Sequence, residues 1–351
     1  MRDLFGKTDV LQYEKTRLFE DLTDVLVREA NVKSVIAEDG TPDEIVGWAR
    51  EANLNISSVL NTSEVLLGLL FSRNIIVHGK LANKVSDCID GGIKFLLANQ
   101  CKSGGWTTSE AEVATASGNL VSTSLAVWAF SEFELLFDRD SPVITATLAR
   151  AYEFISSCQK SEGMHYRFRQ ASLKPRVMAT AYALLSYVNL CIYADSVPDG
   201  NGFFAGIAGK IADVAEIMEN SIDSGSASFF EQAICFIALK QIFKHGLDVS
   251  RDKNIERLYG KIEENLRAVD EEVAVFPYND TRDTRENGTE SDFCYFTPVW
   301  MLIAVDYGYS TDVPYKTELL RELAKTLRLN GNRIRIIYEG REWIWAIAQV
   351  L

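Results

Sequence analysis

Five aromatic residues could do chemistry by their type and spacing: Trp128, Tyr182, Phe236, Trp300 and Trp345. Each falls near the second turn of a segment that is apolar on almost every face. The electron-rich faces of such rings attract cations, so a wall of them could stabilise a positively charged ligand or intermediate. The same rings could also simply fill a hydrophobic core, which is the simpler of the two interpretations.

Residues for acid–base chemistry are scarce. The chain has only three histidines, His78, His165 and His245. His165 opens a polar stretch that ends at Arg169 and could form a polar rim beside a site. The histidine count therefore limits any mechanism that depends on proton transfer near neutral pH.

The composition limits the classes of partner. The chain has 351 residues, 47% of them hydrophobic, which is enough for a large core in one big domain or two ordinary ones. Its 49 acidic residues outnumber 36 basic ones and give a formal net charge of -13. A phosphate backbone would attract the opposite balance, and the longest basic cluster is Arg333-Ile334-Arg335. We expect no nucleic-acid partner.

The sequence predicts a cytoplasmic protein. Its N-terminal segment is charged and lacks the apolar core of a signal peptide. The apolar run Val65–Phe71 is too short to span a bilayer. The six cysteines contain no CxxC pair and are typical of reduced, buried thiols.

The elements that must position the aromatic residues are paired helices. FLLANQCKSGGW (Phe95–Trp106) is typical of an amphipathic helix that ends at a glycine pair. FISSCQKSEGMH (Phe154–His165) repeats the phenylalanine, glutamine and glycine about sixty residues later, with a histidine in place of the tryptophan. A nearly apolar helix follows each copy.

The same alternation extends along the chain and predicts about six hairpins, each with an amphipathic first helix and an apolar second helix. Outside the second motif, the predicted first helices are Thr41–Asn53, Leu81–Gln100, Phe204–Ser221, Asn254–Val269 and Tyr315–Leu329. The predicted second helices are Asn61–Asn74, Ser122–Leu136, Met178–Ala194, Ser228–Phe243, Asp292–Tyr307 and Glu342–Leu351. An extra helix is expected around Leu11–Ala30, in a helical extension covering residues 1–40.

Helices that alternate in this way close most simply into an all-α fold, a single-domain α/α toroid covering residues 1–351. The alternative is an open solenoid of stacked hairpins. We favour the toroid because the second helices are too apolar for one exposed face. A long acidic loop at residues 270–291 interrupts the pattern, and we expect a mobile connection that could act as a lid.

A resemblance to a known family supports this fold. Five residues match the pattern F-L-x-x-x-Q-x-x-x-G-x-W: Phe95, Leu96, Gln100, Gly104 and Trp106. The pattern resembles the glutamine–tryptophan repeat of squalene and terpenoid cyclases, which is related to repeats in protein prenyltransferase β subunits. The resemblance implies that the glutamine ties an outer helix to the next hairpin while the tryptophan stacks beside it. Four residues form the weaker second copy: Phe154, Gln159, Gly163 and His165.

The resemblance also implies which residues the family chemistry would need. Neither the D-x-D-D acid motif nor the D-D-x-x-D magnesium motif of terpenoid cyclases is present. Asp292, Cys294 and Tyr295 match the D-x-C-Y of prenyltransferase β subunits, whose aspartate and cysteine bind zinc. The third zinc ligand of that family, a histidine, is missing, as is its diphosphate-binding histidine. We therefore expect no metal and no cofactor, with Asp292 capping a helix and Cys294 packed.

Two functions remain open. The first is a divergent, non-catalytic toroid that binds a ligand or a protein partner, which the missing motifs favour. The second is an enzyme for an apolar, isoprenoid-like substrate in the central cavity, which the aromatic residues favour. The candidate residues for the cavity are Trp128, Tyr182, Asp292, Cys294, Tyr295, Trp300 and Trp345.

Overall fold

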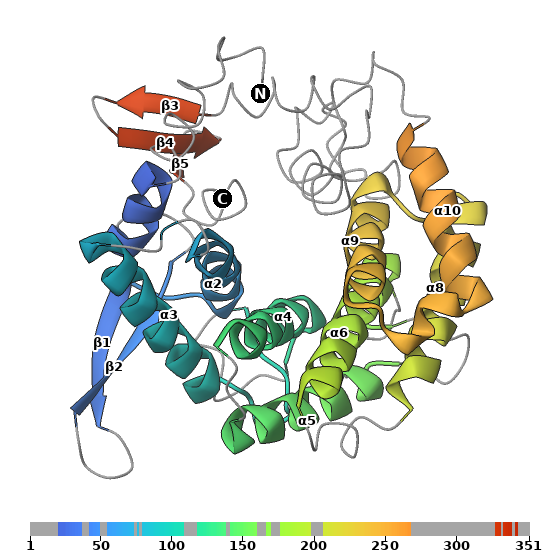
Figure 1. Ribbon diagram of the computed structural model, residues 1–351, viewed down its shortest axis with the longest axis horizontal. Helices are drawn as coiled ribbons and strands as arrows, with labels where there is room; N and C mark the ends of the chain where they lie inside the picture. The colour runs from blue at the N-terminus through green and yellow to red at the C-terminus, as the bar shows by residue number, and fades with distance from the viewer. Residues whose placement is uncertain are drawn as a thin grey trace. The chain divides into compact units, whose positions relative to one another are not determined.

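The computed structural model describes residues 20–36, 42–49, 55–73, 76, 79–108, 118–137, 141–159, 166–169, 176–197, 206–267, 327–330, 333–338 and 341–342 (Figure 1). The chain divides into two compact units, one of Met1–Arg150 with Thr326–Leu351 and one of Ala151–Lys325. The expectation of a single domain stays a prediction.

The first unit contains three helices that the sequence predicted. They are α2 (Val59–Arg73), α3 (Lys80–Ala98) and α4 (Leu120–Phe137). Helix α2 packs against both α3 and α4. Helix α3 buries one face, whereas α4 is buried on almost every side. This difference confirms the predicted contrast between the first and second helix of a hairpin.

Two strands are found near the first helix of the first predicted hairpin, Thr41–Asn53. Strands β1 (Asn31–Ile36) and β2 (Pro42–Gly47) pair antiparallel, with Val32 opposite Val46. The predicted helix Thr41–Asn53 is therefore wrong. The helix expected around Leu11–Ala30 is present over residues 20–28, within the described part of that stretch, whereas residues 31–36 of the predicted 1–40 extension form β1. The reason is that side-chain exposure alternates along β1 and along the first four residues of β2, which is the period of a half-buried ribbon and not of a helix.

A second sheet corrects the C-terminal prediction. Strands β3 (Leu327–Asn330), β4 (Arg333–Tyr338) and β5 (Arg341–Glu342) pair antiparallel in this order. The end of the predicted helix Tyr315–Leu329 and the start of the predicted helix Glu342–Leu351 are thus strands. The sequence LRLNGNRIRI alternates with period two around a Gly-Asn pair, which is a hairpin signal that the helical repeat concealed.

The second unit is helical. The boundary between the units falls within α5 (Pro142–Ser157). The helices that follow are α6 (Val177–Ser196), α8 (Ile207–Asp223), α9 (Phe229–His245), the short 3₁₀ helix η2 (Asp248–Arg251) and α10 (Lys253–Arg267). Helix α6 packs against α8 and α9, and α10 packs against both as well. These elements confirm the predicted helices of this region.

Two features explain where α9 starts and stops. Ser228 and Glu231 form a capping box, in which each side chain accepts a hydrogen bond from the other residue's backbone N–H. At the other end, Gly246 takes the left-handed conformation, with φ 62°, that commonly closes helices.

Helices α4 and α6 are long and apolar enough to cross a membrane, judged by length and composition alone. Of these two stretches, 72% and 83% is buried inside the protein, as in the core helices of a globular fold.

The glutamine–tryptophan motif joins the end of α3 to neighbouring elements. The Gln100 Nε2 donates to the carbonyl oxygen of Thr147 in α5 at 2.9 Å. The Trp106 indole Nε1 donates to the Leu96 carbonyl oxygen at 2.8 Å, and its backbone N–H donates to Thr123 Oγ1 at 3.0 Å. Trp106 is fully buried. These hydrogen bonds tie the end of α3 to α5 and to the start of α4.

The same arrangement recurs at two other aromatic residues. The backbone N–H of Trp48 donates to Thr62 Oγ1 at 3.0 Å, and that of Tyr166 donates to Thr180 Oγ1 at 3.1 Å. Both threonines lie in the first turns of second helices. Tyr166 therefore takes the place that we assigned to His165, which lies outside the described residues. Trp48 was missed because we placed it inside a helix.

A cation from the following first helix meets the glutamine of each motif. Arg150 Nε of α5 donates to Gln100 Oε1 at 2.9 Å, and Lys210 Nζ of α8 donates to Gln159 Oε1 at 2.7 Å. The glutamine thus binds the next hairpin through its carbonyl oxygen, which explains why an amide recurs at this position.

Candidate functional site

The structure describes only part of the predicted ligand-binding set. Trp128 and Tyr182 are buried on α4 and α6, with 3% and 4% of their surface exposed. The remaining candidates lie outside the described residues: Asp292, Cys294, Tyr295, Trp300 and Trp345. Gly163 of the second motif and the predicted lid at residues 270–291 lie outside them too.

Phe236 joins α9 to α10. Its ring stacks on Tyr259 of α10, with centroids 5.4 Å apart and planes 15° apart. The Nζ of Lys240 lies 5.1 Å from the Phe236 centroid and 4.7 Å from the Tyr259 centroid. Cation–π attraction and stacking thus hold this helix pair together. For Phe236 the core interpretation holds.

Tyrosine hydroxyls in the second unit form a buried chain. The Tyr166 hydroxyl donates to the Tyr187 hydroxyl at 3.1 Å, and Ser156 Oγ lies 3.3 Å from Tyr187 Oη. Burial raises the pKa of Tyr187 to about 12, and burial together with Tyr187 raises the pKa of Tyr166 well above its usual value. Both phenols are therefore protonated at neutral pH and act as hydrogen-bonding groups that join α5 to α6.

Trp128 belongs to a different kind of environment. Its ring meets Phe71 of α2 edge to face, with centroids 6.3 Å apart. Its indole Nε1 donates to the Glu132 Oε1 at 3.1 Å, one helical turn further along α4. Phe71 and Glu132 are each partly exposed. The Glu132 carboxylate thus lies beside the Trp128 ring, on the less buried side of α4.

A guanidinium group lies along the same pair of helices. Arg73, in the last turn of α2, places its Cζ 4.1 Å from the centroid of Phe137 in α4. Phe137 also packs against Phe133, with centroids 4.8 Å apart. Arg73 is favoured at this place by the C-terminal dipole of α2 and by the ring beneath it.

We call Phe71, Arg73, Trp128, Glu132 and Phe137 the α2–α4 cluster. It combines three aromatic rings with one carboxylate and one guanidinium, and all of it except Trp128 is partly exposed. Aromatic faces bind the C–H faces of ring-shaped ligands, while carboxylate and guanidinium groups bind hydroxyls. Side chains of these types could bind a polar ring.

Metal binding and thiol chemistry depend on which side chains cluster in the described part of the chain and on how deeply its thiols are buried. No group of three His, Cys, Asp or Glu side chains there could hold a metal ion. Burial raises the pKa of Cys88 and Cys191 to about 11 and that of Cys158 to about 12. Those thiols are unreactive at neutral pH because the nucleophile is the thiolate.

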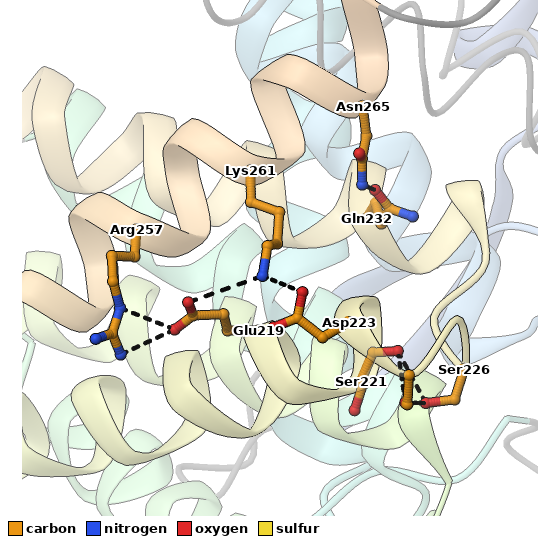
Figure 2. A network of polar contacts seen from close by, with 9 residues as sticks. Glu219, Ser221, Asp223, Ser226, Gln232, Arg257, Lys261 and Asn265 are labelled. Atoms are coloured by element: carbon orange, nitrogen blue, oxygen red, sulfur yellow. Dashed lines mark hydrogen bonds and ion pairs between the residues drawn. The ribbon is translucent and has the colours of Figure 1, made fainter.

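A polar network in the second unit shows how charges serve packing. Figure 2 shows Arg257 and Lys261 of α10 reaching Glu219 and Asp223 of α8. Arg257 Nη2 lies 3.0 Å from Glu219 Oε2, and Lys261 Nζ pairs with Asp223. The charges are matched within the network, so it joins two first helices and carries no sign of a ligand site.

Sequence reasoning found Trp128 and missed the rest of the α2–α4 cluster. The Trp128–Glu132 pair had a signal, since residues four apart share a helix face. Phe71, Arg73 and Phe137 had none, because their contacts depend on how α2 packs against α4.

Comparison with known proteins supports the fold. No protein-family model and no curated protein sequence matches this chain. Solved structures do: the cellobiose 2-epimerase of Bacillus thermoamylovorans B4167 covers 96% of this chain and 99% of its own, with a TM-score of 0.62 and 10% identity. A sugar epimerase from a ruminal bacterium covers 96% and 97%, with a TM-score of 0.59 and 12% identity. The cellobiose 2-epimerase of Spirochaeta thermophila DSM 6192 covers 95% and 87%, with a TM-score of 0.59 and 12% identity.

These matches confirm the predicted α/α toroid over nearly the whole chain. They refine the family resemblance, because these three toroids are sugar epimerases and not terpenoid cyclases. At these identities they establish the fold alone.

Proposed function

We propose that this protein is a carbohydrate-binding α/α toroid and that the α2–α4 cluster contacts the sugar. The observation that carries the proposal is the pairing of the Trp128 indole with the Glu132 carboxylate, beside the ring of Phe71. A sugar presents C–H groups on its faces and hydroxyls at its rim, which suit an aromatic ring and a carboxylate respectively. The epimerase activity of the structurally similar proteins adds a reason to test saccharides first.

The charged groups argue against the isoprenoid alternative. An apolar ligand would cover Glu132 and Arg73 without offering either group a hydrogen bond, which costs free energy. A saccharide offers hydroxyls to both groups. Cyclase-like binding of a hydrocarbon is therefore the weaker candidate.

We further propose that the protein binds without epimerising. Inverting the carbon next to a carbonyl requires a base that removes its proton and an acid that returns one. Histidine is the residue best suited to that exchange near neutral pH. The one histidine among the described residues, His245, ends α9 and lies outside the α2–α4 cluster. Binding is therefore the function that the cluster supports.

Calorimetric titration of the full chain with cellobiose, mannobiose and glucose tests the proposal, with farnesol as the apolar probe. Glu132→Gln keeps an acceptor for the Trp128 indole but removes the charge, so saccharide affinity should fall about tenfold. The matched control is Glu153→Gln, on the exposed side of α5, which should bind like the unaltered protein. Binding of farnesol in place of every saccharide would reject the proposal.

Proton NMR of cellobiose incubated with the protein in D₂O separates binding from catalysis. We expect the proton at C2 of the reducing sugar to persist. Its replacement by deuterium would show proton exchange at that carbon and would make the protein an enzyme.

A further inference from the structure

Arg73 of the α2–α4 cluster has a different kind of neighbour from the arginines that form ion pairs. The ion pairs among the described residues give Arg28 and Arg257 a carboxylate each, and none of them includes Arg73. Its guanidinium group lies over a ring instead, with Cζ 4.1 Å from the centroid of Phe137. The side chain is partly exposed, so solvent reaches it.

The contact with the ring leaves the hydrogen-bonding capacity of Arg73 unused. A guanidinium group carries five N–H donors in one plane, and an aromatic ring attracts its charge without accepting ordinary hydrogen bonds. Within the described part of the chain, no hydrogen bond from the Arg73 side chain accompanies the contact with Phe137. The donors are therefore held in place by the ring and left to water or to a ligand.

Arg73 also lies apart from the carboxylate of the same cluster. Trp128, which holds Glu132, and Phe137, which lies beneath Arg73, are separated by about 14 Å along the axis of α4, at about 1.5 Å per residue. No ion pair joins Arg73 to Glu132. The two charged groups are thus separate contacts, and a ligand that reaches both is longer than one sugar ring.

We propose that Arg73 binds a carboxylate of the saccharide, so that the preferred ligands are acidic oligosaccharides that contain a uronic acid. This rests on the proposed function, since it requires that the α2–α4 cluster contacts a sugar. The planar fork of arginine matches the two oxygens of a carboxylate, and charge-assisted hydrogen bonds of this kind are stronger than those to a neutral hydroxyl.

The charges of the cluster favour a carboxylate over a phosphate group. One guanidinium group balances the single charge of a carboxylate, whereas a phosphate dianion would meet one cation and the negative charge of Glu132 in the same cluster. The whole chain has a net charge of -13 and repels an acidic ligand at long range. Preference for an acid therefore requires a particular cation at the site.

Calorimetric titration of the full chain at constant ionic strength tests this role. The acidic probe is cellobiouronate, in which a carboxylate replaces the primary alcohol on the non-reducing unit of cellobiose, and its methyl ester is the uncharged counterpart. The unaltered protein should bind the acid about tenfold more tightly than the ester. In Arg73→Gln the acid should bind no more tightly than the ester, because only the net negative charge of the chain then acts on it.

Two further variants separate a specific contact from a general effect of charge. Arg28→Gln removes the same charge from an arginine that already pairs with Asp24 at 2.9 Å, and the preference for the acid should stay within about twofold. Arg73→Lys keeps the charge without the planar fork, so the preference should persist at a lower level. Each ratio of acid to ester is measured within one variant, so a smaller folded fraction affects both ligands alike.

The outcomes distinguish this proposal from the proposed function. Binding of cellobiose without any preference for cellobiouronate over its ester would overturn the role of Arg73 and leave carbohydrate binding in place. An equal loss of preference in Arg28→Gln and Arg73→Gln would overturn it as well, as would tighter binding of glucose 6-phosphate than of cellobiouronate. Failure of every saccharide to bind, neutral or acidic, would reject the proposed function itself.

Discussion

Trp106 and Trp128 are both buried in the first unit, but their indole N–H groups have different acceptors. Trp106 donates to a backbone carbonyl, that of Leu96. Trp48 repeats this geometry, with its indole donating to the Leu26 carbonyl at 2.7 Å. Trp128 donates to a side-chain carboxylate instead. A backbone acceptor fixes the course of the chain, whereas a carboxylate brings a charge beside the ring.

Residue type and burial therefore do not distinguish a ligand-binding site from a contact that only holds helices together. The α8–α10 network has as many charges as a binding site would have, but Glu219 and Asp223 are matched by the cations of α10 (Figure 2). The α9–α10 pair likewise combines a cation with rings and serves packing. What distinguishes the α2–α4 cluster is that it joins two second helices, whereas the α8–α10 network joins two first helices.

The largest expected effect tests the structural side of the comparison. Trp106→Ala should lower the free energy of unfolding by roughly 3–5 kcal/mol, because a fully buried ring leaves a cavity. Trp128→Phe keeps an aromatic ring and should cost about 1 kcal/mol or less. Urea unfolding of both variants measures the difference. Equal losses in the two variants would contradict the distinction between Trp106 and Trp128.

The next effect tests whether the hydrogen bond between a threonine and the backbone of an aromatic residue is a true repeat. Thr123→Val should cost about 1–3 kcal/mol, since it leaves the buried backbone N–H of Trp106 without its acceptor. Thr62→Val and Thr180→Val remove the same acceptor at the other two aromatic residues and should cost similar amounts. Denaturant titration of the three variants checks this. If only Thr123→Val lowered the free energy of unfolding, the contact would be particular to the Trp106 motif and not a repeat.

Helix alternation in the sequence was enough to predict the α/α toroid and most helices of both units. It failed at β1–β2 and β3–β5, where a strong period of sixty residues concealed short stretches of period two. At these strands the prediction followed the repeat and ignored the local period-two pattern.

The candidate site was less predictable than the fold. Trp128 was found because the helical period set its position, and Glu132 lies one turn away on the same face. Arg73 was not found, because its contact with Phe137 depends on the way two helices pack.

A smaller effect is expected in the α8–α10 network. Arg257→Met should cost less than about 1 kcal/mol, because the arginine side chain is 58% exposed and surface ion pairs contribute little. The loss should shrink further at 1 M NaCl, where screening weakens the pair in the unaltered protein. Saccharide affinity should not change in this variant. A loss of affinity equal to that of Glu132→Gln would remove the contrast between the network and the α2–α4 cluster.

The smallest effect concerns pH, and it follows from His245 at the end of α9. Burial, followed by the positive charge of Lys244, lowers the pKa of His245 below its ordinary value of 6.5. The folded protein therefore binds this proton less readily than the unfolded chain. Stability is lost as pH falls from about 6.5 through the lower folded pKa, and this contribution is flat at higher pH.

His245→Gln isolates that contribution, because every other titrating group is shared by the two proteins. The stability gap between the unaltered protein and the variant should therefore shift against the unaltered protein as pH falls from 7.5 to 5.5, by an amount that urea unfolding at both values measures. Saccharide affinity should remain the same in both proteins, since His245 is not part of the α2–α4 cluster. An identical pH dependence of stability in the two proteins would mean that His245 titrates alike in the folded and unfolded chain. A variant that lost saccharide binding would instead place the end of α9 at the ligand, and with it a histidine able to exchange a proton with the sugar.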